Sequence, residues 1–294
     1  MTLHTGDEVA IIGPASQLRG TDRELLAKAV SVLESWGLRV RVNVSQEHHF
    51  YLAGADSVRA EQLRAALSNE GIRAIFCLRG GYGSARLLKY LGVVEHVGQK
   101  FFVGYSDVTT LHGAVAHLWP QVDLVYGPNV ATRQFLDDSP DGESTRKSLR
   151  ELLFDPNRRV SEKIEFIRPG VAEGRLTGGC LSMLTSLLGT SYAHDTDGTI
   201  LFIEDVGEAP YRIDRMLTHL RNAGKLAGVR GIVFGEMRNC NDPYNDLRLV
   251  ISDLFKDDSF PVGFGLRSGH GASNLSLHLG AHAKLDSSES TFRM

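Results

Sequence analysis

The stretch FFVGYSDVTTLHGAV, residues 101–115, joins a buried strand to a helix through a short polar turn. Gly104 permits a sharp bend there, which would expose the hydroxyl of Ser106 at the carboxyl end of a sheet. A nucleophile elbow usually has a second small residue two places after the serine, but Val108 stands at that position. These residues alone leave two interpretations open, an N-cap of the helix and a catalytic nucleophile.

Strand-like and helix-like segments alternate along the first half of the chain. Further apolar runs predict strands within residues 8–16, 38–44, 72–80 and 123–130. Segments with helical spacing accompany them at residues 21–36, 56–71, 84–92 and 144–154. Thr21 is placed to cap the first of these helices. Repeated crossovers of this kind indicate an α/β fold, with a parallel sheet covered by helices.

The sequence changes character after Asp155. Residues 156–172 are charged and interrupted by proline and glycine, which is typical of a linker. Beyond it we expect helices at residues 180–189, 211–224 and 246–255, and strands at residues 198–207, 230–237 and 260–266. The tail, residues 275–286, alternates strictly and predicts one strand. The expected domains are therefore residues 1–155 and a smaller α/β domain at residues 173–294.

Charge and cysteine content argue against several classes of function. Lys and Arg number 32 against 35 Asp and Glu, so the chain has no basic footprint for nucleic acid or a membrane surface. Its three cysteines lie far apart, which predicts neither a disulfide framework nor a zinc site. The N-terminus lacks a basic segment before its apolar run, so it resembles a first strand more than a signal peptide. We expect a cytoplasmic protein that binds a small ligand.

A second glycine-rich turn, in CLRGGYGSARLL at residues 77–88, also follows a strand and opens a helix. Gly80, Gly81 and Gly83 do not fit G-x-G-x-x-G, and no G-K-[ST] follows, so a dinucleotide or P-loop site is poorly supported. The turn can be a flexible connection only. It can also bring a bare backbone N–H close to a substrate carbonyl, where a side chain would obstruct the approach.

Three histidines are candidates for metal binding or catalysis. His278 and His282 have the spacing of a helical metal pair, but on a strand four residues span ~13 Å, too far to share one metal. His270 lies between Gly269 and Gly271 in a polar loop after a strand, where it is either a turn residue or a catalytic base.

An acidic residue ends another apolar run. Glu204 follows four apolar residues, where a carboxylate is costly unless it is paired. A salt bridge to Arg212 or Arg215 would explain it, and so would catalysis. Physical reasoning does not choose between Glu204 and its neighbours Asp205, Glu208 and Asp214.

Six stretches in order resemble the LD-carboxypeptidase family of serine peptidases, which also contains microcin C immunity hydrolases. They are residues 51–67, 78–88, 102–112, 176–190, 200–220 and 268–286. The resemblance implies a catalytic triad of Ser106, Glu204 and His270. It implies an oxyanion hole from the backbone N–H groups of Asp107 and of the glycine-rich turn, most simply Gly81 with Gly80 as the alternative. It further implies an active site in a cleft between an N-terminal domain with the serine and a C-terminal domain with the other two residues.

The family's activity is the release of terminal D-Ala from murein tetrapeptides, by cleavage of the amide between an L-configured centre and a D residue. The resemblance therefore implies a small peptide substrate, no metal and no cofactor, and we add a homodimer as the expected assembly. Arg79, Gly80 and Tyr82 are candidates for binding substrate, with Arg79 suited to a free carboxylate. Two alternatives stay open, hydrolysis of a microcin C-like aminoacyl nucleotide and a ligand-binding module without enzymatic activity.

Overall fold

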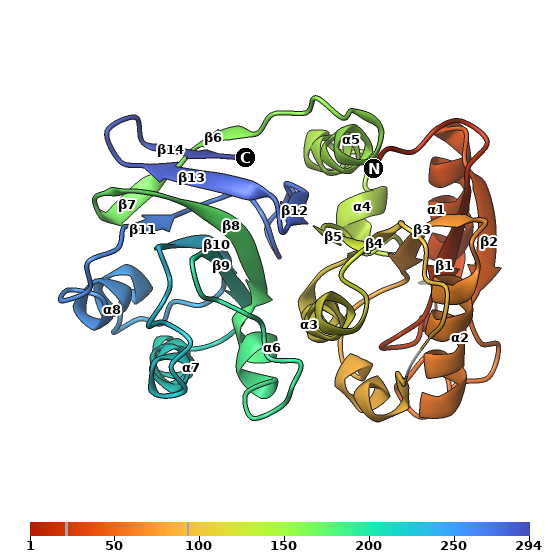
Figure 1. Cartoon of the computed structure of the whole chain (residues 1–294), viewed down its shortest axis with the longest axis horizontal. Coiled ribbons are helices and arrows are strands. Elements are labelled where there is room, and N and C mark those ends of the chain that lie inside the picture. The colour runs from red at the N-terminus through yellow and green to blue at the C-terminus, as the bar shows by residue number, and fades with distance from the viewer. Residues whose placement is uncertain (21–22, 93) are drawn as a thin grey trace. The chain divides into compact units, whose positions relative to one another are not determined.

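The computed structural model describes residues 1–20, 23–92 and 94–294 and divides the chain into two compact units (Figure 1). Unit 1 comprises residues 1–157 and 272–277, and unit 2 comprises residues 158–271 and 278–294. Thr21, the expected cap of the first helix, lies outside the described residues. No helix among the described residues has the length and apolar character to cross a membrane.

A six-stranded sheet has the order β12-β5-β4-β3-β1-β2; strands β1 to β5 belong to unit 1, and β12 begins at the last residue of that unit. The strands of this sheet are β1 (Glu8–Ile12), β2 (Arg39–Asn43), β3 (Ile72–Cys77), β4 (Phe101–Gly104), β5 (Asp123–Tyr126) and β12 (Leu277–Leu279). The first five strands are mutually parallel, as the alternation of the sequence predicts. The carboxyl ends of β3, β4 and β5 are therefore neighbours, and the turns that follow these strands gather at one edge of the sheet.

Helices pack on this sheet along its length. They are α1 (Arg23–Ser35), α2 (Asp56–Ser68), α3 (Thr109–Leu118), α4 (Arg133–Leu136) and α5 (Pro140–Phe154), with 3₁₀ segments η2 (Ser84–Tyr90) and η3 (Ser106–Val108). Alternate side chains of the central strands, such as Val9, Phe76 and Val103, are fully buried and form one core with apolar residues of α1 and α5. Parallel strands are covered on both faces, which explains why β3 and β4 are continuous apolar runs.

Unit 2 contains an eight-stranded mixed sheet with the order β6-β14-β13-β8-β9-β10-β11-β7. Its strands are β6 (Ser161–Lys163), β7 (Glu165–Arg168), β8 (Val171–Cys180), β9 (Thr199–Val206), β10 (Gly231–Arg238), β11 (Val262–Phe264), β13 (His282–Asp286) and β14 (Thr291–Arg293). The central strands β8 to β11 run parallel, whereas the strands at both edges pair antiparallel. Helices α6 (Leu181–Ser186), α7 (Pro210–Asn222) and α8 (Leu247–Leu254) supply apolar residues to its core (Figure 1). Both units are thus α/β, as expected.

Two segments differ from the sequence-based expectation. Residues 156–172, expected as a linker, contain β6 and β7, whose short polar sequences pair as edge strands of the unit 2 sheet. The tail, expected as one strand, is two strands separated at Gly280, which has a φ of +93°. A glycine adopts that conformation at little cost, so the alternation of apolar residues continues across a turn.

Candidate active site

Ser106 occupies a strained turn at the end of β4. Its φ is +63°, in the left-handed region, which costs a residue other than glycine of order 1 kcal/mol or more. The N-caps of η3 and α3 are Tyr105 and Val108, so Ser106 lies inside the turn and does not cap either helix. The cap interpretation is therefore wrong, and the backbone has the strained geometry of a nucleophile elbow.

The neighbours of Ser106 explain the residues of the elbow. A Cβ on Gly104 would lie 2.7 Å from Cγ1 of Val108 and 3.1 Å from Oδ1 of Asn129, so only glycine fits there. Val108 thus fills the space under the turn where other elbows have a small residue. Asn129, which follows β5, holds the turn from the other side: its Oδ1 accepts the N–H of Tyr105 at 3.4 Å, and its Nδ2 donates to the Tyr105 carbonyl at 3.3 Å.

The glycine-rich turn after β3 lies against the same serine. A Cβ on Gly80 would be 3.1 Å from Cβ of Ser106 and 3.2 Å from its Oγ, so the bare backbone of Gly80 packs on the side chain of Ser106. Gly81, with a φ of +99°, packs instead on the side chain of Ser16, whose Oγ accepts the N–H of Tyr82 at 3.1 Å. The structure therefore brings Gly80, more closely than Gly81, to the side chain of Ser106.

Asp107 connects the elbow to the glycine-rich turn. Its carboxylate is buried and accepts the backbone N–H of Ser84 at 2.9 Å, while the Ser84 hydroxyl donates to the Asp107 carbonyl at 2.5 Å. Burial raises the pKa of the Asp107 carboxyl, and the bonds from Ser84 oppose that rise. The segment after β3 and the segment after β4 are thus joined through both the side chain and the backbone of Asp107.

Glu204 and His270 meet in unit 2. Glu204 belongs to β9 and is fully buried, and its Oε2 lies 2.7 Å from Nδ1 of His270 and accepts the His270 backbone N–H at 3.1 Å. A carboxylate only accepts hydrogen bonds, so this contact assigns the proton to Nδ1 and leaves Nε2 as the basic nitrogen. Arg212, one of the salt-bridge partners considered for Glu204, pairs with Glu208 instead.

The other acidic residues near Glu204 have different partners. Asp205 accepts the N–H groups of Ser182 and Val206, at 2.9 and 2.8 Å. Asp214 accepts the hydroxyl of Thr218 at 3.2 Å. Among Glu204, Asp205, Glu208 and Asp214, Glu204 is the one that contacts a histidine ring within the described part of the chain, so the structure separates residues that the sequence leaves equivalent.

Both glycines that flank His270 pack against carboxylates. A Cβ on Gly269, whose φ is +115°, would overlap the Glu204 carboxylate, and one on Gly271 would lie 2.7 Å from Oε1 of Glu236. Sequence reasoning missed Glu236, although it ends an apolar run in β10 as Glu204 does in β9. Burial and the nearby Glu204 charge raise the pKa of the Glu236 carboxyl. The G-H-G pattern is thus explained by two carboxylates on either side of the histidine.

The remaining predicted residues are Arg79 and Tyr82, in the glycine-rich turn, and the pair His278 and His282. Nη1 of Arg79 donates to the carbonyl of Gln17 at 3.2 Å, and Tyr82 is 49% exposed. His278 and His282 fall on the two strands that Gly280 separates. Across the described residues, no three His, Cys, Asp or Glu side chains come together as metal ligands.

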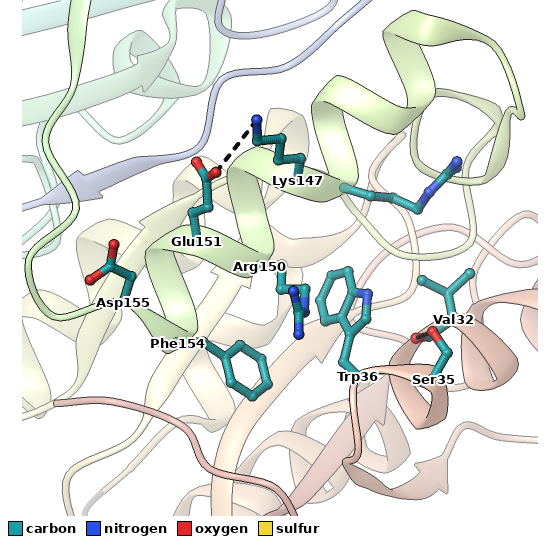
Figure 2. Close-up of a pocket in the computed structure, with 9 residues that line it drawn as sticks. Val32, Ser35, Trp36, Lys147, Arg150, Glu151, Phe154 and Asp155 are labelled. Carbon is teal, nitrogen blue, oxygen red and sulfur yellow. Dashed lines mark hydrogen bonds and ion pairs between the residues drawn. The ribbon is translucent and has the colours of Figure 1, made fainter.

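A cavity of about 560 Å³ lies elsewhere in unit 1, between α1 and α5 (Figure 2). Trp36 and Phe154 are apolar residues that line it, and Arg150 and the ion pair of Lys147 with Glu151 also line it. None of the predicted catalytic or substrate-binding residues lines it, so this cavity is separate from the candidate active-site residues.

Comparison with known proteins agrees with these observations. Residues 9–127 match the LD-carboxypeptidase N-terminal domain, and residues 173–285 match the LD-carboxypeptidase C-terminal domain. A probable murein peptide carboxypeptidase of Bacillus subtilis (strain 168) is 36% identical, over 98% of this chain and 92% of its own length. The structure of muramoyltetrapeptide carboxypeptidase from Oxalobacter formigenes has a TM-score of 0.81 at 30% identity and covers 97% of each chain. The microcin C7 self-immunity protein MccF in complex with aspartyl sulfamoyl adenosine has a TM-score of 0.88 at 22% identity over 100% of this chain and 97% of that chain, a likeness of fold alone. The chain therefore belongs to the LD-carboxypeptidase family.

Proposed function

We propose that this protein is a serine carboxypeptidase that removes the terminal D-Ala from murein tetrapeptides. The observation that carries the proposal is the strained backbone of Ser106, held between the ends of three parallel strands in a chain of this family. The contact between His270 and Glu204 supplies the second element that a serine hydrolase requires, a base oriented by a carboxylate. The names of the Bacillus and Oxalobacter relatives support the substrate class.

In the proposed reaction, Ser106, His270 and Glu204 act as one triad. Nε2 of His270 takes the proton of the Ser106 hydroxyl as Oγ attacks the carbonyl of the scissile amide. The imidazolium then gives that proton to the leaving nitrogen, and D-Ala departs with an acyl-enzyme left on Ser106. Water, deprotonated by His270, attacks the acyl group, the bond to Oγ breaks, and the imidazolium returns its proton to Oγ as the shortened peptide leaves. Glu204 stabilises the imidazolium at both steps and keeps the ring in the required tautomer.

The developing oxyanion needs two backbone donors. We assign one to the N–H of Asp107, directly after the nucleophile, and the other to the glycine-rich turn, at Gly81 or Gly80. The packing of Gly80 on Ser106 supports a donor from this turn, because the turn lies against the Ser106 side chain. We further assign Arg79, Gly80 and Tyr82 to the substrate site, with the Arg79 guanidinium as partner of the substrate's terminal carboxylate.

The proposed triad also gives each domain a catalytic role. We propose an N-terminal domain, residues 1–155, that carries the nucleophile and a C-terminal domain, residues 173–294, that carries the base and its carboxylate. We also propose a cytoplasmic location, which the three free thiols support because the cytosol keeps cysteines reduced. A homodimer is the proposed assembly, and sedimentation of the purified protein tests it.

Reaction with a fluorophosphonate tests whether the protein is a serine hydrolase at all. We expect stoichiometric modification of the wild type at Ser106, located by peptide mapping, and none in Ser106→Ala. A ligand-binding module would remain unmodified at every serine. Incubation of the wild type with an aminoacyl sulfamoyl adenosine tests the other family activity, and cleavage of that compound in preference to a murein tetrapeptide would contradict the proposed substrate.

A further inference from the structure

A fully buried arginine lies beneath the glycine-rich turn. The guanidinium of Arg59, in α2, donates from Nε to the carbonyl of Gly54 at 3.1 Å and from Nη1 to the carbonyls of Gly83, at 3.0 Å, and Pro14. Its Nη2 donates to Oδ1 of Asp56 at 2.6 Å. One side chain therefore holds three backbone segments that are distant in sequence, at residues 14, 54 and 83.

This arrangement costs free energy that a merely structural site could avoid. Removal of a guanidinium from water is unfavourable, and burial lowers the pKa of Arg59 against the opposing effect of Asp56. Apolar residues of similar volume often stabilise a fold as well as a buried ion pair does. The three backbone segments that Arg59 holds in place explain better why a charged side chain is kept at this position.

The turn that Arg59 holds is intrinsically loose. Gly81 and Gly83 both have positive φ values, +99° and +126°, and glycine has more conformational freedom than any other residue. A Cβ on Gly83 would overlap the side chain of Leu52 and lie 3.2 Å from Nη1 of Arg59, so the backbone rests directly on the guanidinium. Arg86, in the following η2, is tied to α2 by two 2.9 Å contacts of its Nε with the Asp56 carboxylate.

The held segment continues to the nucleophile. The residue after Gly83 is Ser84, whose N–H and hydroxyl bond to the carboxylate and the carbonyl of Asp107. Asp107 directly follows Ser106 and supplies the first proposed oxyanion donor. The path from Arg59 through Gly83, Ser84 and Asp107 therefore links the two backbone segments that carry the two donors.

We propose that Arg59 and the side chain of Asp107 are positioning residues, which fix the glycine-rich turn relative to Ser106 so that two backbone N–H groups converge on one oxyanion. The inference rests on the proposed serine mechanism and extends it to residues that do not touch substrate. Oxyanion donors act at 2.7 to 3.1 Å from the oxygen, and a misplacement of about 1 Å can cost about 10²-fold in rate.

Arg59→Met tests this inference, with Arg64→Met on the same helix as the matched control. Arg64 also contacts a backbone carbonyl, that of Tyr90 at 3.5 Å, but it does not reach the glycine-rich turn. We expect Arg59→Met to lower kcat on a murein tetrapeptide by about 10- to 100-fold with KM changed less than about 3-fold. We expect Arg64→Met to match the wild type and Arg59→Lys, which keeps the charge and part of the contacts, to fall between them.

A second readout separates positioning from general loss of structure. A peptide boronate forms a tetrahedral adduct on the serine and places an oxygen in the oxyanion hole, so its affinity should fall with kcat in Arg59→Met. Ser84→Ala and Asp107→Asn, which alter the link at its other end, should lose boronate affinity in the same direction. They also keep the inference testable if Arg59→Met does not fold.

Different results would refute the positioning role of Arg59 and the serine mechanism on which it rests. If folded Arg59→Met keeps wild-type kcat and boronate affinity, or if folded Ser84→Ala and Asp107→Asn both do, the positioning role is wrong. If wild-type Ser106 itself reacts with neither fluorophosphonate nor boronate, the serine mechanism is wrong and this inference falls with it. If the boronate binds but the tetrapeptide is not cleaved, only the proposed substrate is wrong, and the boronate affinities of the variants still decide the role of Arg59.

Discussion

Oε2 of Glu204 contacts His270 twice, at 2.7 Å from Nδ1 and at 3.1 Å from the backbone nitrogen. One carboxylate oxygen therefore fixes the imidazole ring and the loop that carries it. Because the carboxylate is fully buried within β9, directly after four apolar residues, it has little freedom to rotate away. This contact selects the tautomer in which Nε2 accepts a proton.

Replacement of Glu204 by glutamine should nearly abolish turnover. The amide can donate a hydrogen bond to Nδ1 and so favour the wrong tautomer, and the analogous change in serine proteases lowers kcat by about 10⁴. We expect a decrease of that order in kcat on a murein tetrapeptide, measured with circular dichroism as a check of folding.

Asp205→Asn and Glu208→Gln are the matched controls. Asp205 accepts backbone N–H groups of Ser182 and Val206, so its replacement should lower the melting temperature more than kcat. Glu208 pairs with Arg212 on the surface, and its loss should be mild. Retention of most activity by Glu204→Gln, together with its loss in either control, would move the orienting carboxylate to that neighbour.

Gly269→Ala should inactivate the enzyme through Glu204. The new Cβ would overlap the carboxylate, which would have to move away from His270. Gly265→Ala is the control, because Gly265 also has a positive φ, +88°, but no atom lies within 4 Å of its Cβ position. We expect similar backbone strain in both variants and a loss of kcat in Gly269→Ala at least about 10-fold larger. Equal kcat values in the two folded variants would show that the contact with Glu204 is unimportant.

The strain at Ser106 predicts a difference between two inactive variants. Glycine adopts a φ of +63° readily, whereas alanine keeps the Cβ that makes this conformation costly. Ser106→Gly should therefore be more stable than Ser106→Ala by about 1 kcal/mol, and neither should turn over substrate. Urea unfolding of both variants measures the difference, and a less stable glycine variant would mean that the turn is not strained.

The hairpin of β13 and β14 should lose stability in acid. Asp286 accepts the Ser288 hydroxyl at 2.6 Å and lies 3.1 Å from the Lys284 ammonium, contacts that lower its pKa from 3.8 to about 2. A carboxyl with a lowered pKa binds fewer protons in the folded state, so its stabilisation is complete above pH 3.8 and is lost as the pH falls to about 2. Urea unfolding of the wild type and of Asp286→Asn should show a stability difference that shrinks over this range. A constant difference would contradict the assigned pKa.

Much of the fold could be predicted because parallel strands that are buried on both faces appear in the sequence as continuous apolar runs. The apolar runs of β3, β4 and β9 have few polar residues, and Gly or Pro separates them from their helices. Strands β6 and β7 carry no such signal, because these short edge strands bury none of their side chains fully. The break at Gly280 could not be predicted for another reason: apolar residues alternate on both sides of it, as they would in one continuous strand.

The site was predictable in its residues but not in its contacts. Position at a strand end singled out Ser106 and Glu204, and flanking glycines singled out His270. The sequence leaves Glu204 and Asp205 equivalent, and their contacts separate them: Glu204 contacts the His270 ring, whereas Asp205 accepts backbone N–H groups. Arg59 could not be found in this way: a charged residue in an amphipathic helix is expected at the surface, and two of its carbonyl partners, Pro14 and Gly83, come from segments distant in sequence.

Mass spectrometry of a murein tetrapeptide incubated with the wild type and with Ser106→Ala tests directly whether release of D-Ala depends on the Ser106 hydroxyl. The account predicts that the wild type releases free D-Ala and leaves the tripeptide, and that folded Ser106→Ala releases neither above background. It also predicts no cleavage of the same peptide ending in L-Ala, because the family's activity is defined by a D residue at the terminus. Release of D-Ala by folded Ser106→Ala at near the wild-type rate would contradict the serine mechanism.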